Sequence, residues 1–445
     1  MRWPEYCALL DRYRPDVAHL YRLLMAVKHI HLNKHSHQPP ALVVLGQASC
    51  GKTTMLEEVY TGPELDVWLD KFTGASFVTG GSQLDEEEAK NIDWLPRIRF
   101  RTVHCSDLNA ILGGHRDVIR GTIGDLTRIL DGKGYLKATG NNPTRPYEGD
   151  YRWALLGGCT PFSTEAWAAM SEAGPRLFFV NMRTRAVGDG MDSPSITHES
   201  RSTLIAAATN LLRTHWWDYC WGHPQPIGLM CELDAMPAEV KKWLNRAAIL
   251  TSKARAMFRE VGGVTRLDEE KPWRARTFYA ELAIGHMTAR EGTSVTVADL
   301  APVLEVAVET GREFLGHLCR AVVRCGGVVP VDYFCAFQNM TESDATVVFQ
   351  KAVSVGLGQI MVGSGTGRPV TAFSVRGGPF SWLGEEEVRQ LMWEDKRLDD
   401  PAGTPSPTPP PPSTIHPPSP PPTLQPPPLA SVAENAAAIL TSNRW

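Results

Sequence analysis

The chain has 445 residues, 43% of them hydrophobic, which is enough to bury a large core and suggests about two to three domains. Its 45 Lys and Arg residues against 49 Asp and Glu residues give a formal net charge of −4, which excludes an overall basic protein and confines any nucleic-acid contact to a local patch. Nine cysteines without a CxxC pair, no signal-peptide pattern and no apolar run of roughly 20 residues predict a soluble, cytoplasmic protein with no membrane segment.

Residues 1–40 are expected to form an N-terminal helical segment that ends in the histidine-rich stretch KHIHLNKHSH. The spacing of His29, His31, His35 and His37 fits no zinc-binding pattern. We interpret this stretch as a polar helix end or a loop.

The next stretch, ALVVLGQASCGKTTML, predicts a buried parallel strand at 41–45, a glycine-rich turn and a helix. The turn fits the pattern GxxxxGK[ST], in which backbone N–H groups surround phosphate oxygens. Lys52 is expected to reach the β- and γ-phosphates of ATP, and the Thr53 hydroxyl to bind Mg²⁺. An accidental glycine turn between a strand and a helix is the alternative. The predicted ATP-binding segment comprises Gly46, Gln47, Ala48, Ser49, Cys50, Gly51, Lys52, Thr53 and Thr54.

A P-loop also needs a carboxylate for Mg²⁺, usually at the end of a neighbouring strand. The alternating stretch in RIRFRTVHCSD ends at Asp107, which is the Walker B candidate and the second expected magnesium ligand. The next position is Leu108 and not the glutamate that usually polarises the attacking water. Helix capping is the alternative role of Asp107. Asp131 and the run Glu86–Glu88 are the alternative acids.

Two further polar residues border predicted strands. The apolar run WALLGGCTP ends in Thr160, whose hydroxyl can sense the γ-phosphate. Arg176 stands where the strand LFFV begins, and an arginine there can stabilise charge on the phosphoryl group bound by a neighbouring subunit. A surface arginine at a strand edge is the alternative.

The order of these motifs, ending in SEAGPRLFF, resembles the AAA+ ATPases, and specifically a group of P-loop ATPases encoded by bacteriophages and integrative elements. The segments FTGASFVTGG and LTRILDGKGYLKATG add to the resemblance, which covers about residues 13–381. It implies that 41–235 form the AAA+ ATP-binding core, with Asp107 as Walker B, Thr160 as sensor 1 and Arg176 as the arginine finger.

Residues 236–310 are expected to form an all-helical lid, with a capped helix start at Thr296 to Asp299. Arg274 is the sensor 2 candidate, because an arginine at the head of a lid helix can lie over the γ-phosphate and report ATP against ADP. Arg276 is the alternative for this role, and a solvated surface arginine is the alternative for both.

Residues 311–385 follow the order helix, helix, helix, hairpin, which predicts a winged-helix-like domain. This layout resembles replication initiators and helicase loaders, which suggests DNA as a partner. The recognition helix would begin Thr341-Glu342-Ser343-Asp344, and its two carboxylates would face phosphates. We therefore prefer protein contact or simple packing for this helix.

Residues 397–428 are proline-rich and are expected to form a disordered linker, followed at 429–445 by a short helix or tail that can bind a protein partner. The stretch HWWDYCW places Trp216, Trp217 and Trp221 at helical spacing. We prefer a buried aromatic face for these residues over base stacking.

Together these features predict an α/β fold: a P-loop parallel-sheet core with a helical lid, a small winged-helix-like domain and a disordered proline-rich tail. The expected function is that of an ATPase that uses ATP and Mg²⁺ in DNA-associated remodelling or loading in a mobile-element setting, as a homo-oligomer. The alternative is a slowly hydrolysing nucleotide switch, in which ATP binding orders the lid and recruits protein partners.

Overall fold

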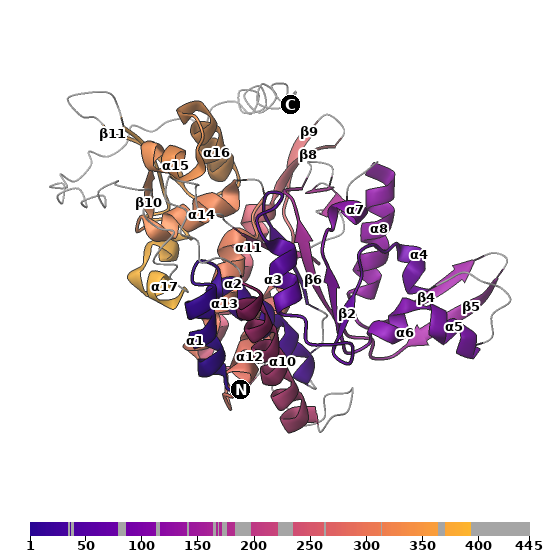
Figure 1. Cartoon of the computed structure of the whole chain (residues 1–445). Coiled ribbons are helices and arrows are strands. Elements are labelled where there is room, and N and C mark those ends of the chain that lie inside the picture. Colours follow the sequence, from indigo (N-terminus) through magenta and orange to yellow (C-terminus); the bar gives the residue numbers. More distant parts are fainter. Residues whose placement is uncertain are drawn as a thin grey trace. The chain divides into compact units, whose positions relative to one another are not determined.

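A five-stranded parallel sheet in the order β2-β3-β6-β1-β7 lies at the centre of the fold (Figure 1). Its strands are β1 (Ala41–Leu45), β2 (Asp66–Trp68), β3 (Thr102–Cys105), β6 (Ala154–Cys159) and β7 (Phe178–Asn181). Every residue of β1 and β6 is buried, as expected for parallel strands that are covered on both faces. The predicted α/β fold with a parallel sheet is confirmed.

The computed structural model describes residues 1–33, 36, 40–78, 86–112, 116–139, 142–162, 166–167, 169–170, 176–182, 197–220, 235–261, 264–312, 314–363 and 370–392.

Successive side chains of β1 enter two different hydrophobic cores, because they point to opposite faces of the sheet. Leu42 and Val44 belong to the larger core, and Val43 and Leu45 to the smaller one. Around the larger core lie α1 (Trp3–Tyr13), α2 (Ala18–His29), α3 (Lys52–Glu58), α10 (His198–Cys220), α11 (Ala238–Arg255), α12 (Trp273–Ala289) and α13 (Ala301–Glu309).

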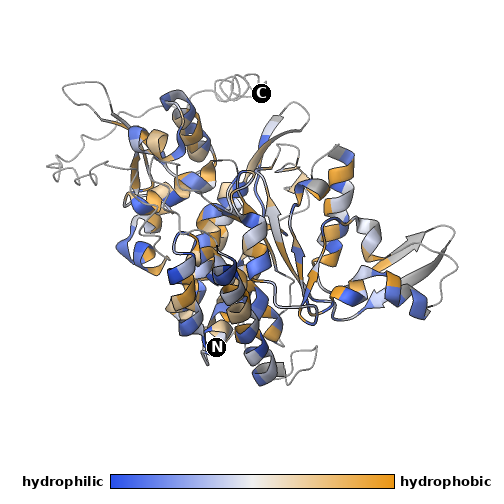
Figure 2. Ribbon diagram, in the orientation of Figure 1, coloured by the Kyte–Doolittle hydropathy of each residue, from blue (hydrophilic) through white to orange (hydrophobic). Residues whose placement is uncertain are grey.

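The smaller core is closed by short helices and by one longer amphipathic helix, α8 (Arg116–Ile129). Figure 2 shows hydrophobic and hydrophilic residues alternating along α8, as in a helix with one face on a core and one in solvent. The short helices are α4 (Gly74–Phe77), α6 (Trp94–Ile98) and α7 (Asn109–Leu112). The remaining elements of this part are α5 (Glu86–Ile92), the pair β4 (Gly134–Thr139) and β5 (Asn142–Glu148), and the 3-10 helix η1 (Ile30–Leu32).

The region expected to form the lid shares the larger core with the sheet. Gly285 of α12 lies so close to α2 that a Cβ at this position would stand 2.1 Å from the Ala26 carbonyl oxygen. The expectation of an all-helical region is wrong for the strands β8 (Met257–Val261) and β9 (Val264–Asp268), which form a two-stranded sheet. The stretch MFREVGGVTRLD has the residue pair Gly-Gly between two alternating segments, which is a hairpin signal in the sequence.

The C-terminal helices and strands follow the order expected for residues 311–385, with an additional strand and an additional 3-10 helix. They are α14 (Leu315–Arg324), β10 (Val328–Pro330), α15 (Val331–Gln338), α16 (Glu342–Ser354), β11 (Gln359–Gly363) and β12 (Val370–Ser374), followed by η4 (Ser381–Gly384) and α17 (Glu386–Leu391). The three strands form an antiparallel sheet in the order β10-β12-β11. The predictions for 397–428 and 429–445 lie outside the described residues.

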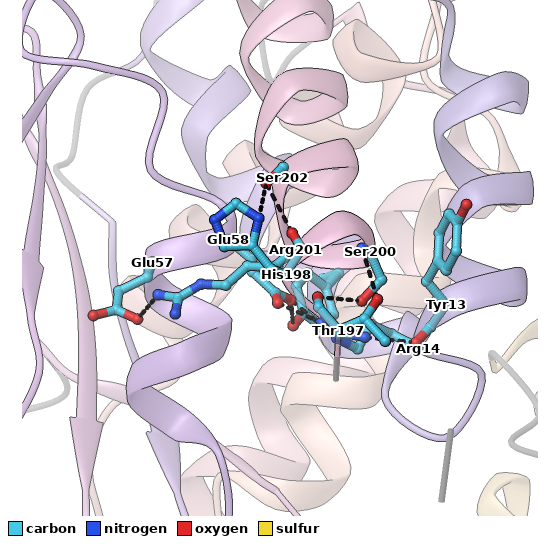
Figure 3. Close-up of polar contacts among 10 residues, drawn as sticks. Tyr13, Arg14, Glu57, Glu58, Thr197, His198, Ser200, Arg201 and Ser202 are labelled. Atoms are coloured by element: carbon cyan, nitrogen blue, oxygen red, sulfur yellow. Dashed lines mark hydrogen bonds and ion pairs between the residues drawn. The ribbon is translucent and has the colours of Figure 1, made fainter. Parts of the chain in front are cut away.

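Two adjacent glutamates fix the C-terminal end of α3 (Figure 3). Glu58 is fully buried and accepts hydrogen bonds from Arg14, whose Nε is at 3.0 Å, and from the Tyr21 hydroxyl. Glu57 is partly exposed and forms an ion pair with Arg201 of α10. The helix that follows the glycine-rich turn is therefore tied to both the N-terminal helices and α10.

Glu58→Ala removes the carboxylate between two buried polar side chains. We expect the free energy of unfolding to fall by about 3–5 kcal/mol, because the Arg14 charge stays buried without its partner. The matched control is Glu57→Ala, which removes an ion pair whose side chains are both 39% exposed and should cost less than about 1 kcal/mol. Urea denaturation followed by circular dichroism measures both variants. Equal losses would contradict a special role of the buried glutamate.

Candidate functional site

The glycine-rich turn leaves the carboxyl end of β1 and contains two residues in the left-handed region. Ser49 has φ +63° and Gly51 has φ +95°. Glycine adopts this conformation without a Cβ penalty, whereas a serine there is strained. The Gly46 N–H donates to the Cys159 carbonyl at 3.0 Å, which fixes the start of the turn on β6.

Lys52 folds back along this turn. Its Nζ donates to the carbonyl oxygens of Gly46 at 2.8 Å and Gln47 at 2.7 Å. Residues 47–49 and Thr53 are exposed, so a ligand can reach the turn from solvent.

Gly158 of β6 allows the turn and the end of β3 to approach each other. A Cβ at position 158 would lie 2.7 Å from the Ser106 carbonyl oxygen and 3.5 Å from Cβ of Lys52. The Leu108 N–H donates to the Gly158 carbonyl at 2.8 Å. A side chain at 158 would therefore clash with the Ser106 carbonyl and displace the segment that carries Asp107.

Asp107 and Thr160 are joined by a residue that the sequence analysis did not single out, Asn109. The Asn109 backbone N–H and its Nδ2 donate to Asp107 Oδ1 at 2.9 and 2.8 Å. The same Nδ2 donates to Thr160 Oγ1 at 2.8 Å. Asp107 therefore also binds the start of α7, in line with its alternative role at a helix end. An amide two positions after the aspartate was the signal available in the sequence.

Neighbouring groups fix the orientation of the Asn109 amide. An ionised Asp107 can only accept, so the NH₂ group must face it. On the other side the Cys159 thiol donates to Asn109 Oδ1 at 3.1 Å. Burial and, second, the Asp107 charge raise the pKa of Cys159 to about 12, so this thiol keeps its proton at neutral pH. Because Thr160 accepts from Asn109, its own hydroxyl hydrogen is left to donate to another group.

Leu108 directly follows Asp107, at the position where P-loop ATPases usually have the glutamate that polarises the attacking water. Its side chain is buried in the smaller core, and a Cβ on Gly157 would lie 2.4 Å from Leu108 Cδ1. A carboxylate at this position would be buried against apolar neighbours, which is costly.

Arg176 and Arg274 meet at the other edge of the sheet. Arg176 precedes β7 and so lies at the amino edge of the sheet, whereas the glycine-rich turn follows β1 at the carboxyl edge. The five residues of β1 separate the two edges by about 16 Å. Asp131 Oδ1 accepts from Arg176 at 3.1 Å and from Arg274 at 3.5 Å. Arg176 is only 8% exposed and also donates to the Thr127 carbonyl. Arg276 is partly exposed on α12.

The other sequence-predicted groups lie apart from this site. His29 is buried with its Nε2 2.9 Å from Nδ1 of His215, and burial lowers its pKa well below the usual range. His35, His37 and Trp221 lie outside the described residues. Within the described ranges, no group of three or more His, Cys, Asp and Glu side chains is arranged to hold a metal ion. None of the helices in those ranges combines the length and hydrophobicity that crossing a bilayer requires.

Comparison with known proteins identifies no family for the chain. No protein-family model and no curated protein matches it. Two solved structures of the NrS-1 C-terminal region, both described as the A form without ligand, are similar to it at TM-scores of 0.28 and 0.26 and sequence identities of 12% and 11%. These similarities cover 84% of this chain and 75% and 74% of those chains.

Asn109→Ala tests whether this amide orients Asp107 for a metal ion. We expect the affinity for Mg²⁺ in the presence of ATP to fall about 10- to 100-fold, as for other side chains that orient a ligand, while ATP binding without metal stays unchanged.

The matched control is Asn210→Ala on the exposed face of α10, which should leave Mg²⁺ affinity unchanged. Calorimetric titration of Mg²⁺ into the protein with ATP measures all of these variants. If Asn109→Ala binds Mg²⁺ as tightly as the wild type does, the Asn109 side chain has only a structural role.

Proposed function

We propose that this protein is an ATP-binding P-loop ATPase. The observation that carries the proposal is the arrangement at the carboxyl edge of the sheet. Lys52 of the GQASCGKT turn and the Ser106 carbonyl, which directly precedes Asp107, both lie beside Gly158, and Asp107 is joined through Asn109 to Thr160. A nucleoside triphosphate needs a cation for its phosphates and a carboxylate for its metal ion. Here the cation lies on the glycine-rich turn after β1, and the carboxylate follows β3, which is separated from β1 by β6.

The residues at this edge suit ATP and Mg²⁺. The Lys52 ammonium offers a point charge to the phosphates, and the exposed Thr53 in the first turn of α3 offers a hydroxyl oxygen. Asp107 offers its second carboxylate oxygen, because Oδ1 already accepts two hydrogen bonds from Asn109. Mg²⁺ prefers oxygen ligands, and when bound it would neutralise charge on the phosphate oxygens.

The buried Leu108 supports a second candidate, a slowly hydrolysing nucleotide switch that recruits protein partners. An acid at position 108 would be the usual group to polarise the attacking water, and this chain has an apolar side chain there instead. Thr160 can still hydrogen-bond a phosphate oxygen and so distinguish two nucleotide states. Turnover separates the candidates, since a motor needs repeated hydrolysis stimulated by DNA.

We also propose that the ATPase acts as a homo-oligomer in DNA-associated remodelling or loading, in a mobile-element setting. The motif order that resembles bacteriophage AAA+ ATPases supports this, as does the helix and strand order from α14 to β12. Glu342 and Asp344 in the first turn of α16 argue against base reading by that helix.

Lys52→Ala removes the charge predicted to bind the phosphates and keeps helix propensity. We expect ATP affinity to fall at least about tenfold, since a charged contact to phosphate is lost, with the fold preserved. Calorimetry with ATP, together with circular dichroism, measures both. Unchanged ATP binding in a folded Lys52→Ala protein would overturn the ATP site.

Asp107→Asn separates metal binding from nucleotide binding. It should leave metal-free ATP binding largely intact and reduce the gain in affinity that Mg²⁺ provides, together with hydrolysis. Titration of ATP with and without Mg²⁺ is the measurement. Equal magnesium dependence in variant and wild type would show that another acid has this role.

Arg176→Ala tests the arginine-finger prediction, in which a neighbour's phosphate must compete with Asp131 for the guanidinium. We expect ATP binding to be spared and turnover to be lost. Mixing Arg176→Ala with Lys52→Ala should restore part of the ATPase activity, because shared interfaces regain one intact turn and one intact arginine. If light scattering shows co-assembly and the mixture stays inactive, the role between subunits is wrong.

A further inference from the structure

A pocket at the amino end of β3 is lined by cationic and aromatic side chains from segments far apart in the sequence. Its walls include Lys28 of α2, His31 of η1, Trp216 of α10, and the consecutive residues Arg99, Phe100 and Arg101. Thr102, the first residue of β3, also lines it. The pocket therefore lies at the edge of the sheet opposite to the glycine-rich turn.

The backbone at the pocket is strained in a way that brings two arginines to it. Phe100 is buried and has φ +57°, which is an outlier for an aromatic residue. Its N–H donates to the Arg152 carbonyl at 2.6 Å, which helps to hold this conformation. Arg99 and Arg101, on either side of Phe100, both line the pocket. Strain of this kind gathers at functional sites.

After the ion pairs among the side chains that line the pocket are taken into account, its remaining charge is positive. The Lys28 ammonium is already occupied by the Val59 carbonyl at 2.6 Å and by Asp66 Oδ2 at 2.6 Å. The acid in the pocket wall, Glu64, forms an ion pair with Arg213. The Arg101 side chain makes no hydrogen bond or ion pair within the part of the chain that the structure describes.

Arg99 is held in place without being neutralised. Its Nε donates to the Asp150 carbonyl, and its guanidinium lies over the rings of Tyr151 and Phe100, 4.9 and 4.8 Å from their centroids. A carbonyl and two rings leave the positive charge intact, so Arg99 and Arg101 together offer two cations to an anionic ligand.

His31 contributes an unsatisfied buried nitrogen. Its Nε2 is inaccessible to solvent and has no hydrogen-bond partner among the described residues. Burial and, second, the charge of Arg152 lower the pKa of His31 to about 3, so the ring is neutral at physiological pH. Buried nitrogens are rarely left unpaired in native proteins, so this nitrogen is an unsatisfied polar group behind the pocket wall.

An exposed aromatic ring stands beside the pocket. The prediction of a buried aromatic face is wrong for Trp217, which is 61% exposed. Its ring centroid is 6.0 Å from that of Trp216 in the pocket wall. A large exposed ring next to a cationic pocket is the combination by which proteins hold single-stranded nucleic acids, through phosphates and base stacking.

We propose that this pocket binds a phosphate of a single-stranded nucleic acid through Arg99 and Arg101, with Trp217 as the stacking surface for an adjacent base. The inference names a partner for the proposed ATPase. It assigns nucleic-acid contact to the amino edge of the sheet and not to α16, whose first turn is acidic. Binding at the pocket needs no ATP, so it is tested separately from the nucleotide site.

The test is fluorescence anisotropy of a labelled oligothymidylate at several salt concentrations, without nucleotide. Arg101→Gln should weaken oligonucleotide binding about tenfold, because one phosphate contact is lost. The slope of log K against log salt concentration should become less steep by about 0.7, the value for one phosphate of a single strand. Trp217→Ala should weaken binding about tenfold through lost stacking, and Trp217→Phe should retain most of it. Circular dichroism checks that each variant is folded.

Matched controls are Arg389→Gln on α17, an arginine 47% exposed, and Trp273→Ala on α12, a tryptophan 68% exposed. Both should bind like the wild type. Equal losses in controls and pocket variants, or no loss in either, would overturn the proposal. So would a wild type that binds inorganic phosphate in competition assays but no oligonucleotide.

Lys52→Ala separates this inference from the proposed function. This variant should lose ATP binding and retain oligonucleotide binding. If wild type binds ATP and no oligonucleotide, the pocket proposal fails alone. If it binds the oligonucleotide and no ATP, the ATPase proposal fails and the pocket stands.

Discussion

Two consecutive glycines in β6 are the constraint on which the carboxyl edge of the sheet depends. Gly157 faces Leu108 in the smaller core, and Gly158 faces Lys52 and Leu56 on the other side of the sheet. Glycine weakens a strand interior, because it loses more chain entropy on folding and packs no side chain. Here it lets the segment after β3 approach the central strand closely, through Leu108 at one glycine and the Ser106 carbonyl at the other. Without that approach the segment that carries Asp107 would be displaced from the edge of the sheet at which Lys52 lies.

Charges at the amino edge are mostly satisfied within the chain. Lys28 and Asp66 are both fully buried and form an ion pair at 2.6 Å beside His104. Burial lowers the pKa of Lys28, and although burial alone would raise that of Asp66, Lys28 and His104 hold it below its usual range. Breaking such a pair leaves an uncompensated buried charge. The pair therefore ties α2 to β2 at this edge, and Arg101 stands out on it as a cation without such a partner.

The sequence was sufficient for those features that depend on near neighbours in the chain. The strand, turn and helix around Lys52 follow from a local motif, and Asp107 and Thr160 follow from strand ends. The amide of Asn109 two positions after Asp107 is a local signal, but its hydrogen bond to Thr160 could not be recognised, because it joins residues 51 positions apart. The same holds for the pairing of Arg176 and Arg274 with Asp131. The strand β10 has three residues, too few for a periodic signal, and the left-handed Phe100 depends on packing that no local pattern encodes.

The strand β3 joins the two proposed sites. It has four buried residues, so it spans about 13 Å at ~3.3 Å per residue, with Arg101 before its amino end and Asp107 beyond its carboxyl end. Parallel pairing with β2 on one side and β6 on the other makes it part of a stiff layer. A ligand on the pocket and a nucleotide on the glycine-rich turn then act on the same short element. If that element has two positions, each ligand shifts its equilibrium, and the effect of nucleic acid on ATP affinity must equal the effect of ATP on nucleic-acid affinity.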